Sequence, residues 1–140
     1  MKQKLYYGRP VNIKSFPELD KPLLQKVVDA FPDWEIEDSG LKKHGDGYLR
    51  FKKEFGNGME YYFQEVLPFC GGGVFLRFRD GMWGAGVYAE AKFFTDRNLP
   101  IWIVDVKGKV RKGSLKRAKV LSIEETIERI RDKEGNPKPY

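Results

Sequence analysis

The amino-acid sequence predicts an α/β fold, a three-layer sandwich in which about five mostly parallel strands, in a flavodoxin-like order, are flanked by helices. Strand-type and helix-type patterns alternate along the chain, as they do around a parallel sheet. The run at 100–106 is apolar almost throughout, which is typical of a strand buried on both faces. The length of 140 residues is that of one domain, which we place at 1–134 with a loose C-terminal tail at 135–140.

The first half of the chain gives three clear elements and one unclear stretch. A strand is expected at 3–7, a helix at 19–31 with Pro22 in its first turn, and an alternating strand at 34–37. Residues 38–58 contain five glycines and show no clear periodicity. A connection of this length is often functional, and either a small strand pair or a lid would fit it.

The second half of the chain continues the alternation. We expect a helix at 58–69, a buried strand at 73–78, a glycine-rich turn, a helix at 86–97 and the strand at 100–106. A basic hairpin at 107–117 and a last strand at 118–122 follow. Ser122 then opens a final helix, because Glu125 three residues later completes a capping box.

Composition narrows the classes of function. The formal net charge of +6 is local, since residues 107–119 hold seven basic residues and no acid; this segment is either a nucleic-acid contact or a solvated hairpin. One cysteine and one histidine exclude a His/Cys zinc site, and no cofactor is expected. The lone His44 is expected to be exposed. With no signal peptide and no apolar run of about 20 residues, we expect a cytoplasmic protein that does not contact a membrane.

Glu90 is the candidate reactive group. Ligands of open parallel sheets bind beyond the carboxyl ends of the strands, where the glycine-rich turn lies. Gly84 and Gly86 in that turn allow close approach to a ligand, and Glu90 follows about one helical turn later, off the apolar stripe. A carboxylate near a helix N-terminus is stabilised as the anion, ready to attack or stabilise a sugar cation; alternatively, it only satisfies the helix dipole.

Other candidates surround the same edge of the sheet. Tyr6 or Tyr7 would orient Glu90, and Asp80 would serve as an acid or base or as a plain turn residue. The remaining candidates are the donors of the loop after the first strand and a base-stacking tryptophan: Gly8, Arg9, Lys14, Ser15 and Trp83.

Two short motifs make the chain resemble the nucleoside 2-deoxyribosyltransferase family, which includes nucleotide N-glycosidases. They are Leu5-Tyr6-Tyr7-Gly8-Arg9-Pro10 at the first strand and Gly86-Val87-Tyr88-Ala89-Glu90, which precedes the strand that begins near Pro100. The resemblance implies that Glu90 is the nucleophile, with a tyrosine beside it. It also implies a nucleoside or nucleotide substrate and a homo-oligomer, because members of the family complete their sites across subunits.

The chain departs from this family at three positions. Gly84 and the run 70–73 stand where the family has acids, and Val87 stands where it has threonine. We therefore expect cleavage or transfer at the N-glycosidic bond of a nucleoside or its 5′-monophosphate. The alternatives are a non-catalytic nucleotide-binding protein and, less favoured, a nucleic-acid-binding module that uses residues 107–119.

Overall fold

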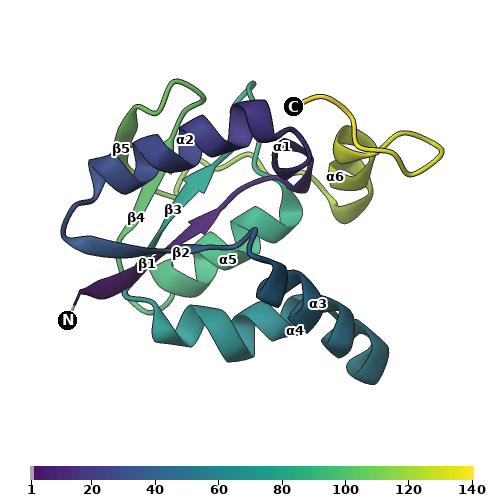
Figure 1. The fold of residues 1–140 in the computed structure, drawn as a ribbon, viewed down its shortest axis with the longest axis horizontal. Helices are drawn as coiled ribbons and strands as arrows, with labels where there is room; N and C mark the ends of the chain where they lie inside the picture. The colour runs from purple at the N-terminus through teal and green to yellow at the C-terminus, as the bar shows by residue number, and fades with distance from the viewer. Residues whose placement is uncertain (1) are drawn as a thin grey trace.

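The computed structural model describes residues 2–140 as a five-stranded sheet with helices on both faces (Figure 1). The strands are β1 (Gln3–Gly8), β2 (Trp34–Asp38), β3 (Gly72–Leu76), β4 (Ile101–Val104) and β5 (Val110–Lys112). The helices are α1 (Val11–Lys14), α2 (Pro17–Ala30), α3 (Lys42–Phe55), α4 (Met59–Tyr61), α5 (Ala85–Thr95) and α6 (Ile123–Ile130). A π-helical turn η1 (Tyr62–Val66) and a 3-10 turn η2 (Leu67–Phe69) extend α4.

The strand order is β2-β1-β3-β4-β5, and the first four strands are parallel. This confirms the α/β sandwich with a mostly parallel sheet. The order is the one described for flavodoxin-like sheets. However, β5 is only three residues long and runs antiparallel to β4, so the flavodoxin-like arrangement is met only in part. The antiparallel direction follows from the short 105–109 connection, because a parallel neighbour would need a crossover of a dozen or more residues.

Two apolar cores hold the layers together. On one face α2 packs its Leu23 and Val27 against Val74 and Val104 of the sheet. On the other face lie α5 and the α4 segment, with Phe94 packed beneath Phe75 (Figure 1). Because both faces of the sheet are covered, β3 reads as a run of buried residues without alternation.

Three sequence predictions need correction. The unclear stretch 38–58 holds no strand pair; it contains the helix α3. Residues 118–122 do not form a strand, since Val120 makes only an isolated bridge to Trp83. The helix predicted at 19–31 begins earlier, at Pro17, so Pro22 lies inside it.

The C-terminal segment, predicted as a loose tail, makes defined contacts. Tyr140 stacks on Phe78 and donates a hydrogen bond from its hydroxyl to the Arg77 carbonyl oxygen. The Asn12 amide donates to the Lys138 carbonyl at 3.1 Å. The capping box of α6 is present as predicted, with Ser122 and Glu125 bonded reciprocally at 3.0 Å. No helix within residues 2–140 is long and apolar enough to cross a bilayer.

Candidate active site

A cleft of about 590 Å³ opens at the carboxyl ends of β1 and β3. Its floor is formed by Tyr6 of β1 and Glu90 of α5. One wall comes from the residues around the start of α3, and the opposite wall includes Thr126 and Ile130 of α6. The cleft thus lies where a parallel α/β sheet is expected to bind ligands.

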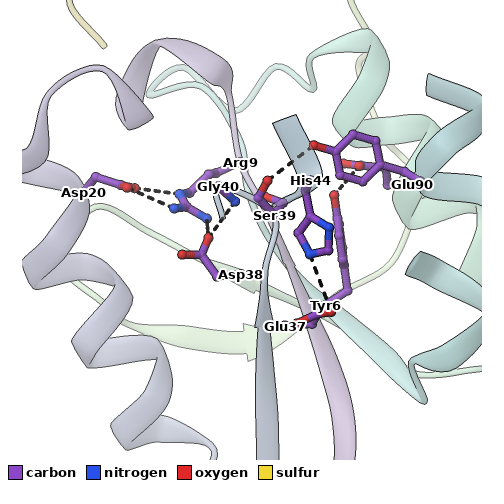
Figure 2. Close-up of polar contacts among 10 residues, drawn as sticks. Tyr6, Arg9, Asp20, Glu37, Asp38, Ser39, Gly40, His44 and Glu90 are labelled. Carbon is purple, nitrogen blue, oxygen red and sulfur yellow. Dashed lines mark hydrogen bonds and ion pairs between the residues drawn. The ribbon is translucent and has the colours of Figure 1, made fainter. Parts of the chain in front are cut away.

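Glu90 lies on the inner side of α5, and its side chain is buried, with 6% of the residue surface exposed. The Tyr6 hydroxyl donates a hydrogen bond to Glu90 Oε2 (Figure 2). No other hydrogen bond within residues 2–140 engages the carboxyl group, so Oε1 is left for a ligand. Tyr6 itself is held by an edge contact with Tyr62 and a tilted contact with Phe94, which fix its ring beneath the cleft.

The protonation of Glu90 differs from the sequence prediction. Glu90 lies beyond the first turn of α5, where the effect of the helix dipole has fallen off. Burial raises the pKa of Glu90 to about 7, and the Tyr6 hydrogen bond and the charge of Lys14 oppose that rise only in part. The carboxyl group therefore exchanges its proton near neutral pH instead of being held as a permanent anion.

Lys14 of α1 is a half-buried cation that the cleft offers to a ligand, beside Lys42 and Arg131, which also line it. It lines the cleft and makes no ion pair or hydrogen bond with another side chain in the described part of the protein. Burial and the nearby Arg9 charge lower the pKa of Lys14. A partly buried ammonium group without a counter-ion favours an anionic ligand group.

Arg9 lines the cleft, but its guanidinium is already paired with two carboxylates. Nε and Nη2 donate to Asp20 at 2.6 and 2.9 Å, and Nη1 donates to Asp38 at 2.7 Å (Figure 2). The Arg9 charge lowers the pKa of Asp38, which also accepts the Gly40 amide at 2.7 Å. This cluster ties β1, α2 and the end of β2 together, so Arg9 shapes the cleft wall and brings it no excess positive charge.

The α3 wall is anchored by a histidine that the sequence analysis expected to be exposed. His44 is 2% exposed, and its Nδ1 lies 2.8 Å from the Tyr61 hydroxyl. Its Nε2 lies 3.5 Å from Glu37 (Figure 2). Burial lowers the pKa of His44. The residue therefore links α3 to β2 and α4 beneath the cleft, which excludes the exposed position predicted for it.

The structure brings together some of the predicted site residues. Tyr6, Arg9, Lys14, Gly84, Gly86 and Glu90 all line the cleft. Tyr7 does not: it faces the α2 core with no exposed surface, and its ring lies 4.5 Å from the Arg9 guanidinium carbon. Successive residues of a strand face opposite sides, so only one of the two tyrosines reaches Glu90, and that one is Tyr6.

Four other predicted residues lie outside the cleft lining. Asp80 is exposed and forms a two-point ion pair with Arg129 at 2.9 and 2.8 Å, which lowers the pKa of Asp80. Trp83 is 1% exposed within the core, so it offers no face for stacking. Ser15 is exposed on the surface, and Gly8 is enclosed by the Phe75 ring.

Sequence reasoning missed the residues that the end of β2, α3 and η1 supply. Ser39, Tyr48 and Tyr62 line the cleft, and the buried Ser39 Oγ has no hydrogen-bond partner among residues 2–140. The glycines of 38–58 obscured the helix α3. No three His, Cys, Asp or Glu side chains gather in the described residues as a metal site would require.

Comparisons with known proteins assign no family. No family model matches the chain, and neither a curated protein nor a solved structure matches it.

Proposed function

We propose that this protein cleaves or transfers at the N-glycosidic bond of a nucleoside or nucleoside 5′-monophosphate, with Glu90 as the nucleophile. The observation that carries the proposal is the Glu90 carboxyl group, buried at the floor of an open cleft with one oxygen bonded by Tyr6 and the other left for a ligand. A carboxylate so placed can attack a sugar whose transition state resembles an oxocarbenium ion.

The chemistry proceeds in two displacements. A Glu90 oxygen forms a bond to the anomeric carbon while the bond from that carbon to the base nitrogen breaks, and the base leaves with the electron pair and takes up a proton. Water or a second base then attacks the same carbon, and the Glu90 carboxylate is released. Tyr6 orients Glu90 throughout, because its hydroxyl donates to the carboxyl oxygen Oε2.

The rest of the cleft suits the other parts of such a substrate. Tyr48, Tyr62 and Phe78 give the lining an aromatic component against which a base can pack. Lys14 provides an unpaired ammonium for a 5′-phosphate. This group supports the phosphorylated substrate over the free nucleoside.

A non-catalytic nucleotide-binding protein is the second candidate, and one observation favours it. Burial raises the pKa of Glu90 to about 7, so about half of the molecules hold a neutral carboxylic acid at neutral pH. A neutral acid is a poor nucleophile but a good hydrogen-bond donor to a ligand. The two candidates differ in turnover and not in the ligand.

Base release separates them. Wild-type protein is incubated with a panel of deoxynucleosides and their 5′-monophosphates, and free base is measured by chromatography. We expect release by the wild type, loss of release with Glu90→Gln, and a covalent glycosyl adduct on Glu90 detectable by mass spectrometry. Asp80→Asn, at an exposed carboxylate outside the cleft, should keep the wild-type rate. Ligand-induced thermal stabilisation without base release from any substrate would select the binding protein instead.

The proposal extends to the cellular location and the oligomeric state of the protein. A nucleoside or nucleotide substrate is consistent with the cytoplasmic location predicted from the sequence. The family resemblance adds a homo-oligomer, for which sedimentation of the purified protein is the direct measurement. A monomer at micromolar concentration would contradict that part of the proposal alone.

A further inference from the structure

A second cavity, of about 460 Å³, lies beyond the carboxyl ends of β3 and β4, beside the β4–β5 hairpin. It shares only Phe78 with the lining of the Glu90 cleft. Four basic side chains line it against one carboxylate, an excess of three positive charges. The basic residues are Arg77, Arg79, Lys109 and Arg111, and the acid is Asp105.

Three of the basic side chains of this cavity, Arg77, Lys109 and Arg111, form no ion pair within residues 2–140. The fourth, Arg79, donates from Nε to the Tyr140 main-chain oxygen at 3.1 Å. Asp105 forms no ion pair with any of the four within residues 2–140; its Oδ1 accepts the backbone amides of Lys107 and Lys109 at 2.9 and 3.0 Å. The carboxylate therefore shapes the turn that presents Lys109 to the cavity.

Two guanidinium groups of the cavity repel each other. Burial and the charge of Arg111 both lower the pKa of Arg77, which is half-buried at the end of β3. A folded chain that gathers like charges without an acid between them gains free energy when an anion enters. Arg77 Nη1 makes only a long contact of 3.5 Å to the Gly81 carbonyl, so the guanidinium is available to donate two hydrogen bonds to an oxyanion.

We propose that this cavity binds a phosphate-bearing small molecule, separately from the Glu90 cleft. Phosphate fits the forked donors of Arg77 and Arg111, which can bond two of its oxygens at once. The apolar lining from Leu76, Val104 and the Tyr140 ring matches the non-phosphate part of such a ligand. A small ligand is favoured over a nucleic-acid strand because the basic groups converge in a cavity and are not spread along a groove.

The test uses inorganic pyrophosphate as the probe, with isothermal titration calorimetry for affinity and amide NMR shifts for location. We expect shifts at Phe78–Gly81 and at 109–111, with Tyr6 and Glu90 unaffected. Arg111→Gln should weaken binding by about tenfold or more, because it removes a charge-assisted contact. Lys112→Gln is the matched control: this neighbour lies over the Trp102 ring, outside the cavity lining, and should keep the affinity.

Three outcomes would overturn the proposal. They are absence of pyrophosphate binding at millimolar concentration, shifts confined to the Glu90 cleft, and equal weakening by both variants, which would indicate general attraction to the basic 107–119 segment. Binding of a single-stranded oligonucleotide that both variants weaken alike would assign the segment to nucleic acid instead. Thermal unfolding of each variant confirms that it is folded.

Discussion

Replacement of Glu90 by glutamine should make the protein more stable at neutral and alkaline pH, although it removes the proposed nucleophile. The amide keeps an acceptor oxygen for the Tyr6 hydroxyl but cannot ionise. In the wild type the pKa of Glu90 is raised from 4.5 to about 7 by burial. That difference corresponds to about 3 kcal/mol, at roughly 1.4 kcal/mol per pH unit.

The sign follows from proton binding. Between pH 4.5 and about 7 the folded protein holds the Glu90 proton while the unfolded chain has lost it. The free energy of unfolding of the wild type therefore falls through this window as pH rises, relative to the variant. The two proteins should be equally stable near pH 4. The variant should be more stable by about 3 kcal/mol at pH 8, and the difference should level off above about pH 8.

Urea unfolding of both proteins at several pH values from 4 to 8 gives this difference directly, because titrations common to both proteins cancel. A difference that stays constant with pH would refute the claim that Glu90 is buried as a neutral acid. If the free energy of unfolding of the wild type instead increased relative to that of the variant as pH rises, the claim would be refuted more strongly. The same ionisation predicts that base release by the wild type increases with pH through about 7, since only the carboxylate attacks.

Further predictions concern the residues that hold the cleft. Arg9→Met should destabilise the fold by about 3–5 kcal/mol, because it leaves two carboxylates without their cation. Arg129→Met, which breaks an exposed ion pair, should cost about 1 kcal/mol or less. Urea unfolding measures both losses, and equal losses would contradict the claim that burial makes the Arg9 cluster the more important one. Gly47→Ala should lower the melting temperature and the activity together, because the alanine Cβ would overlap the Tyr61 ring. Gly45→Ala, in the same helix but with open space around it, should stabilise the protein by about 1 kcal/mol. Similar melting temperatures for the two variants would contradict this contrast. Ser122→Ala should cost about 1 kcal/mol in urea unfolding through loss of the capping box, and no change would show that α6 does not depend on it.

Hydrophobic periodicity and capping residues predicted those helices and strands that neighbouring residues of the chain determine. β1, β2, β3 and β4, α5 and the capped α6 lie where periodicity and capping placed them, within a few residues. The helix α3 could not be predicted, because the reason for a glycine at position 47 is the Tyr61 ring, which leaves no room for a Cβ there and comes later in the chain. A glycine of this kind looks like a helix breaker until its partner is known.

At the candidate site, too, some residues could be predicted from the sequence and others could not. Glu90 could be selected because it lies off the apolar stripe of its helix. The choice between Tyr6 and Tyr7 could not be made, since a strand buried on both faces has no polar side to mark its orientation. The pairing of Arg9 with Asp20 and Asp38 joins residues 11 and 29 positions apart, and no spacing rule reveals it.

The two outer strands of the sheet carry opposite charges, and this affects how copies of the molecule meet. Along β2 the side chains include Glu35, Glu37 and Asp38, while the three-residue β5 presents Arg111 and Lys112. Joining two like edges would bring like charges together. Joining unlike edges is attractive but would propagate into an open filament, and β5 is too short to sustain more than a few backbone bonds. Charge repulsion therefore opposes pairing of two β2 edges or of two β5 edges, and the shortness of β5 limits pairing of β2 with β5.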